Sequence, residues 1–166
     1  MKIKLFFILM AVFAIPVLGQ ESTIEKVFEK NKRTFAVSKF GFGEDAHSGY
    51  DYLVYKKKLQ VQKIRIVWYS SQALRVTDLY FENGKPVLFL ELTARQNQYN
   101  ALKKGLTVPL KVEEKLVFAN SKLKTWSEKG QTIPATDSRW AEKEKEVLTR
   151  FNGELETYQA HVRGEI

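Results

Sequence analysis

The chain has 166 residues, 44% of them hydrophobic, and its 27 basic and 19 acidic side chains give a formal net charge of +8 at pH 7. It contains no cysteine, which excludes disulfides and any lipid anchor that is attached to an N-terminal cysteine. Its stability must therefore come from a hydrophobic core, and a single domain of this length is large enough to build one.

Residues 1–19 have the three parts of a secretory signal peptide. The basic start, the apolar centre and the cleavage site are, in order, Lys2 with Lys4, Leu5 to Ala14, and Val17-Leu18-Gly19. The apolar run is shorter than the span of about 20 residues that crosses a bilayer, and no second such run follows. We expect cleavage before Gln20, export as a periplasmic or secreted protein, and a single domain over residues 20–166 without a transmembrane segment. An uncleaved membrane anchor is the alternative.

The positive net charge of the chain indicates which kinds of partner it could bind. Cleavage would remove Lys2 and Lys4 and lower the formal net charge from +8 to +6. A basic surface favours anionic partners such as acidic polysaccharides or lipid headgroups, although net charge governs non-specific association more than function. We expect an unidentified protein or an anionic envelope component as the partner, and no nucleic acid, because the chain is exported.

The segment after the cleavage site predicts a short amphipathic helix. Within residues 21–33, Ser22 and Glu25 have the spacing of a capping box. The apolar residues on one helical face are Ile24, Val27 and Phe28. The glycine-rich residues 38–49 that follow are typical of a loop.

The best candidates for chemistry lie in and beside this loop: Glu44, Asp45, His47 and Asp51. A histidine and three carboxylates can ligate a metal or transfer protons. Their spacing, however, matches no metal-ligand pattern, and the other histidine, His161, lies far along the chain. Loops are polar in general, with or without a function. We predict no catalytic residue, no metal and no cofactor, and keep a hydrolase or metal-dependent enzyme with its site in residues 44–51 as an alternative.

From Tyr50 onward the sequence has the period of β-strands. Residues 50–56, 63–70 and 73–81 are the first three strand segments. In the second, Ile64, Ile66 and Trp68 alternate with Lys63, Arg65 and Tyr69. This alternation indicates a sheet with one covered face.

Asn83-Gly84 predicts a hairpin with a two-residue type I′ turn, because both turn positions need a positive φ. Counting outward from the turn sets Phe81 opposite Pro86 and Tyr80 opposite Val87. One face is then apolar: Leu79, Phe81, Leu88, Leu90 and Leu92. The other face is mixed: Asp78, Tyr80, Glu82, Lys85, Val87, Phe89 and Glu91.

The mixed face offers a possible binding surface, made of Tyr80, Phe89 and Lys85 with Tyr69 from the preceding strand. Aromatic side chains set among charges are typical of recognition surfaces. The structural alternative is that these aromatics pair across strands and fit a half-covered pleated surface.

The remaining residues predict a second hairpin and a final helix. Residues 93–109 are polar and form a loop or a brief helix, and a hairpin follows around Asn120-Ser121. In residues 136–162, one stripe carries the apolar side chains Trp140, Val147, Phe151, Leu155 and Tyr158. This helix is expected to pack on the apolar face of the sheet.

The hairpin sequences "LYFENGKPVLFLE" and "EEKLVFANSKLKTWSEKG" resemble a broad set of exported bacterial proteins of unknown function. In those proteins an aromatic-rich strand meets an Asn-Gly-Lys turn, and the second strand ends near a Trp. Ser121 departs from the Gly of that pattern. The resemblance implies the sheet and the exported location, and it brings no catalytic or binding residues.

We therefore expect an α+β fold, an antiparallel β-meander of about six strands with an N-terminal helix and a C-terminal amphipathic helix packed on one face. The expected function is a non-enzymatic binding or interaction module that uses an open sheet face or edge. Besides the enzyme, the other alternative is a structural protein that its basic charge holds to the envelope.

Overall fold

The structure is a computed structural model that describes the backbone of residues 17–45 and 48–166, and the side chains of residues 23–43 and 48–166. Its elements are α1 (Val17–Asn31), the 3-10 turn η1 (Lys32–Thr34), β1 (Ala36–Asp45), β2 (Ser48–Lys57), β3 (Gln60–Tyr69), β4 (Leu74–Glu82), β5 (Lys85–Ala94), the 3-10 turn η2 (Gln96–Gln98), α2 (Tyr99–Lys103), β6 (Lys111–Ala119), β7 (Lys122–Glu128), β8 (Gln131–Ile133) and α3 (Trp140–Arg163).

The strands form one antiparallel sheet in which each strand lies beside the next along the chain, from β1 to β8. This confirms the α+β class and the meander, but the sheet has eight strands and not about six. The two additional strands are β1, most of which falls in the residues 38–49 that were expected to be a loop, and the short β8. β1 forms despite its glycines because its backbone pairs with β2 along most of its length.

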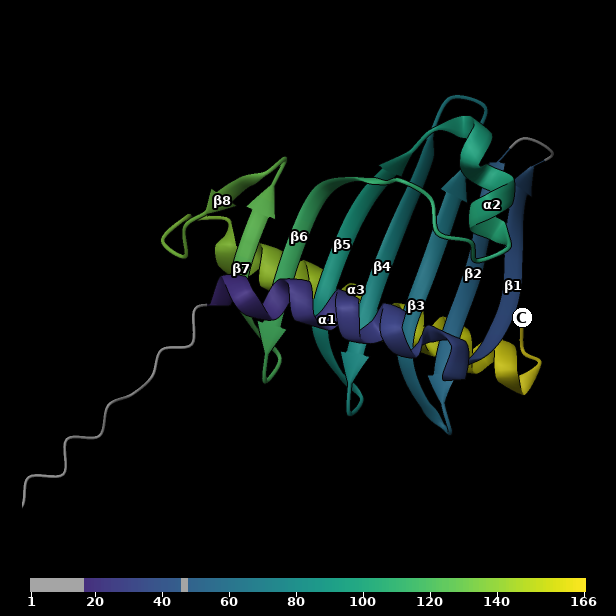
Figure 1. Cartoon of the computed structure of the whole chain (residues 1–166), viewed down its shortest axis with the longest axis horizontal. Coiled ribbons are helices and arrows are strands. Elements are labelled where there is room, and N and C mark those ends of the chain that lie inside the picture. The colour runs from purple at the N-terminus through teal and green to yellow at the C-terminus, as the bar shows by residue number, and fades with distance from the viewer. Residues whose placement is uncertain (1–16, 46–47) are drawn as a thin grey trace, which may run out of the picture.

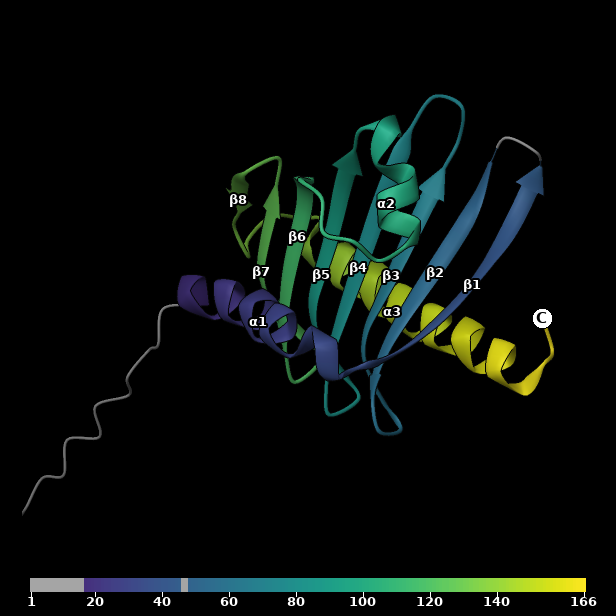
Figure 2. The same ribbon diagram turned by 45° about the vertical axis from the view of Figure 1, so that its right-hand side comes forward.

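The sheet is the middle layer of three (Figures 1 and 2). α1 and α2 lie across one face, called here the α1 face, and α3 crosses the opposite face, called the α3 face. In the part of the chain that the structure describes, no helix combines the length and apolarity needed to cross a membrane.

Both faces of the sheet are therefore buried. The core of the α1 face consists of Phe28, Leu53, Tyr55, Val67, Leu74, Val76, Tyr80, Leu88, Leu90, Leu92, Leu102 and Val117. The core of the α3 face consists of Tyr52, Val54, Ile64, Ile66, Leu79, Phe81, Phe89, Leu116, Phe118, Leu123, Trp126, Val147, Phe151 and Tyr158. Val147, Phe151 and Tyr158 confirm that the C-terminal helix packs on the sheet.

The register of the β4–β5 hairpin differs from the expected one. Asn83 and Gly84 have the positive φ values of 51° and 76° that the turn requires, and Phe81 does lie opposite Pro86. Beyond this pair a one-residue bulge at Val87 places Tyr80 opposite Leu88. Since side chains alternate with a period of two, one extra residue moves all later side chains to the other face.

The bulge corrects the predicted faces. Phe89 lies opposite Leu79 and belongs to the α3 face, while Leu88 and Leu90 share the α1 face with Tyr80. The unbroken apolar run from Val87 to Leu90 was the available signal, because a strand buried on both faces loses its polar alternation.

The same bulge occurs in three hairpins. In β2–β3, β4–β5 and β6–β7, the second residue pair after the turn is followed by one unpaired residue: Gln62, Val87 and Lys124, respectively. A bulge increases the local twist and re-aims a side chain. All three lie near the turns at one end of the sheet, beside α1 (Figure 1).

Candidate binding groove

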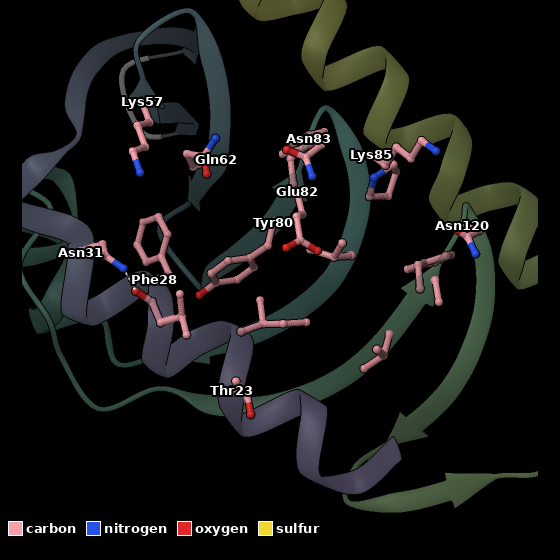
Figure 3. Close-up of a pocket in the computed structure, with 18 of the residues that line it drawn as sticks. Thr23, Phe28, Asn31, Lys57, Gln62, Tyr80, Glu82, Asn83, Lys85 and Asn120 are labelled. Carbon is pink, nitrogen blue, oxygen red and sulfur yellow. Dashed lines mark hydrogen bonds between the residues drawn. The ribbon is translucent and has the colours of Figure 1, made fainter. Parts of the chain in front are cut away.

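A groove of about 620 Å³ lies between α1 and the turn ends of the hairpins on the α1 face (Figure 3). Its volume falls within the range of about 300–1,000 Å³ that is usual for ligand sites. α1 supplies one wall, because the helix crosses the sheet and leaves the hairpin ends uncovered beyond it.

The walls of the groove are apolar. From α1 come Ile24, Val27 and Phe28, and from the sheet come Val87 and Val117. Val27 is 53% exposed, so its side chain is accessible from the groove. These side chains give the groove an apolar body, as is typical of sites for small ligands and peptide segments.

Polar side chains surround these walls. Four amides line the groove: Asn31, Gln62, Asn83 and Asn120. Lys57 and Lys85 lie toward different ends of it in Figure 3, with Glu82 between them. Such groups can orient a ligand through hydrogen bonds, and the two lysines favour a ligand with negative charge.

Two of the lining residues are bulge residues, Gln62 and Val87. The sequence placed Val87 on the same face as Tyr80 and Lys85, but it did not indicate Gln62, because a regular two-residue period gives no extra side chain to this face. The hairpin bulges thus add lining to the groove that uniform strands would lack.

A buried charged cluster supports Tyr80, an aromatic residue that lines the groove. The Lys63 ammonium donates a hydrogen bond to the Tyr80 hydroxyl and pairs with Asp78, both at 2.7 Å. Arg65 donates two hydrogen bonds to the Asp78 carboxylate, at 2.7 and 2.6 Å. Phe28 of α1 covers the cluster, with its ring centroid 4.9 Å from the Lys63 ammonium. All four polar residues of the cluster are at most 8% exposed.

The cluster shifts the pKa of its members. Burial alone would raise the pKa of Asp78, but the charges of Arg65 and Lys63 and their hydrogen bonds outweigh burial and lower it to about 2. Burial, with the nearby charge of Arg65, lowers the pKa of Lys63 to about 8 despite the attraction of Asp78. Burial and the charge of Asp78 raise the pKa of Tyr80 well above its usual range.

This cluster is closed to a ligand in the groove, since Lys63 and Asp78 are each 1% exposed. Lys63 therefore fixes the Tyr80 hydroxyl rather than meeting a ligand. The arrangement is suited to binding, with a rigid aromatic floor, apolar walls and a polar rim.

The structure brings together two of the four residues of the predicted binding surface. Tyr80 and Lys85 both line the groove, Tyr80 almost fully buried and Lys85 exposed. Tyr69 instead lines a second groove together with residues of β1, and its ring centroid lies 4.6 Å from that of Tyr99. Phe89 is 2% exposed on the α3 face, beneath the Arg150 guanidinium.

Of the candidate residues for chemistry, only Asp51 has a described side chain. It accepts a hydrogen bond of 2.6 Å from the Tyr99 hydroxyl and lies 3.4 Å from the Lys103 ammonium. The side chains of Glu44, Asp45 and His47 lie outside the described residues. Among the side chains that are described, no three metal-ligating groups gather at one point.

Comparisons of the chain with protein-family models, with curated proteins and with solved structures find no match.

Proposed function

We propose that the chain is an exported, non-enzymatic binding module and that the groove beside α1 is its ligand site. The observation that carries the proposal is the groove itself, in which apolar walls from α1 and the hairpins converge under a rim of amides and lysines. Ligand sites combine these same features, an apolar body and a few polar groups that set orientation.

The lining suggests the class of ligand. An apolar body would lie between Val27 and Val87, and anionic groups would meet Lys57 or Lys85 at the rim. The overall positive charge of the chain favours the same kind of partner. An anionic envelope component or a protein segment with an apolar side fits both requirements.

Export is compatible with the groove. Cleavage before Gln20 would remove the start of α1, which begins at Val17. The lining residues Thr23 to Asn31 would remain. Mass spectrometry of the chain recovered from the periplasm or medium of expressing cells would test both the location and the new N-terminus.

The experiment compares two arginine substitutions of exposed helical valines. Val27→Arg introduces a bulky charge at the groove, while Val162→Arg makes the same change on α3, where the valine is 62% exposed. Tagged chain 20–166 and both variants are incubated with envelope extract of the source organism, and the retained material is measured at low and high salt. Circular dichroism confirms that the variants fold.

We expect one component to be retained at high salt by the unchanged chain and by Val162→Arg, and to be lost with Val27→Arg. Retention by Val27→Arg would refute the groove as the site. If high salt releases everything from all three proteins, the positive charge accounts for the association, since exposed charges are screened over about 10 Å or less at 0.1 M salt and above. The chain would then be an envelope-associated structural protein.

A further inference from the structure

Among the described residues, the edge strand β1 has no strand partner on its outer side. Its residues pair with β2 from Ala36 opposite Lys56 to Gly43 opposite Gly49. Among the described residues, β1 has a strand neighbour on this side only. Every second residue of β1 therefore directs its N–H and C=O groups away from the sheet, and such an edge is a template for another strand.

The two edges of the sheet differ in how they are protected. At the far edge, β8 has three residues, Gln131–Ile133, and Pro134 follows it, so this edge is too short for extended pairing. β1 has ten residues and no proline. Of the charged residues of β1, Lys39 has a described side chain, and it donates a hydrogen bond to the Lys104 carbonyl at 3.1 Å, on the α1 face. The sheet thus has one closed edge and one open edge.

On the α3 face the open edge is aromatic. Phe40 lies opposite Tyr52, and their rings stack with centroids 4.8 Å apart. The His161 ring of α3 stacks on the same phenylalanine at 4.0 Å, and Phe42 follows two residues later on this face. An added strand would meet these rings with every second side chain, which favours apolar residues there.

On the α1 face the edge adjoins a second groove, of about 500 Å³, which Lys39, Gly41, Asp51, Tyr69 and Lys103 help to line. A side chain at position 41 would not fit, because its Cβ would lie 2.9 Å from an Asp51 carboxylate oxygen and 2.8 Å from the Tyr50 carbonyl oxygen. Glycine at this position leaves the α1 side of β1 open to the side chains of a neighbouring strand.

The charges at this groove select among possible occupants. Two ammonium groups, of Lys39 and Lys103, stand against one carboxylate, of Asp51, which Tyr99 and Lys103 already engage. An acidic side chain of an added strand would compensate this positive charge. A second copy of the chain would instead bring another Lys39 to the same face, because antiparallel pairing of two β1 strands keeps their α1 faces on one side.

We propose that β1 is a strand-addition site for an extended partner segment in which acidic and apolar residues alternate. The backbone of β1 supplies the affinity, the groove on the α1 face takes the acidic side chains, and Phe40 with Phe42 takes the apolar ones. This is the mode in which an extended peptide extends a sheet and side-chain pockets give the specificity. The site is separate from the groove beside α1 and does not depend on the function proposed for it.

The test uses three fluorescently labelled, capped peptides of equal length: alternating valine and glutamate, alternating valine and lysine, and the valine–glutamate peptide N-methylated on every residue. N-methylation removes backbone donors and leaves the side chains in place. Anisotropy is measured with the chain 20–166 and with two charge reversals of exposed strand lysines, Lys39→Glu at the edge and Lys124→Glu on β7 as control.

We expect saturable binding of the valine–glutamate peptide alone, unchanged by Lys124→Glu and weakened about tenfold by Lys39→Glu through the reversed charge. Val27→Arg should not affect it, which separates this site from the groove beside α1. Equal binding of the N-methylated peptide, or of the valine–lysine peptide, would overturn the proposal, as would no binding. Sedimentation of the peptide-free chain as a dimer that the peptide dissociates would show that a second copy occupies the edge, and would also overturn it.

Discussion

Lys63, Arg65, Asp78 and Tyr80 show how single residues can mislead when they are placed by pattern alone. Lys63 and Arg65 occupy strand positions that read as solvent-exposed, yet both are buried beneath α1 around one carboxylate. Asp78 compensates both cations, and no buried polar atom among the described side chains lacks a hydrogen-bond partner. Removing one member of the cluster is therefore expected to leave the charges of the others uncompensated.

Replacing Asp78 tests this expectation. Asp78→Asn leaves two buried cations without their carboxylate, and we expect a loss of about 3–5 kcal/mol in the free energy of unfolding. The matched control is Glu165→Gln, which breaks the exposed Arg163–Glu165 pair and should leave stability unchanged. Urea unfolding at neutral pH measures both variants. A similar small effect for both would show that the cluster contributes little.

The lowered pKa of Lys63 predicts that the stability of the chain changes with pH in the alkaline range. The pKa of this lysine is about 8 in the folded chain against an ordinary value of 10.5. Between these values the unfolded chain binds the proton and the folded chain does not, so the free energy of unfolding should rise with pH, by at most about 1.4 kcal/mol per unit from this group. Urea unfolding from pH 7 to 10 should show this rise in the unchanged chain and a flatter curve in Lys63→Met. Parallel curves would contradict the assignment to Lys63.

At the scale of elements, two hairpins share the same turn geometry. The β4–β5 and β6–β7 hairpins have two-residue turns with positive φ at both positions, and each is followed by a bulge. The expectation of a tight turn at Asn120-Ser121 is confirmed, although Ser121 adopts a φ of 57° that suits glycine better.

Exchanging the two turn residues tests the cost of this conformation. Ser121→Gly should raise the free energy of unfolding by up to about 1 kcal/mol, and Gly84→Ser should lower it by about 1 kcal/mol, because only glycine adopts the left-handed region without a steric penalty. No atom lies within 4 Å of a Cβ built at Gly84, so the change reports on the backbone alone. Thermal unfolding would measure both shifts, and shifts of the same sign would contradict this account.

At the scale of the whole molecule, the strands lie in the sheet in the same order as in the chain. Because each strand pairs with the next, the first and last strands are the edges, and their lengths decide which edge is open. The helix before the first strand, α1, and the helix after the last strand, α3, cover opposite faces of the sheet (Figure 2). The two partner sites proposed above follow from this arrangement: the groove that α1 leaves at the hairpin ends and the edge of β1.

The sequence by itself determined the class of fold, the meander, the position of the tight turns and the packing of the C-terminal helix. These depend on local signals: side-chain period, turn residues and an amphipathic stripe. Only the tertiary structure decided which face each side chain joins, because one unpaired residue at Val87 reverses the alternation that follows it. It also decided that Tyr80 and Lys85 share a groove while Phe89 lies on the opposite face, since burial beneath α1 and α3 depends on contacts between segments far apart in the chain.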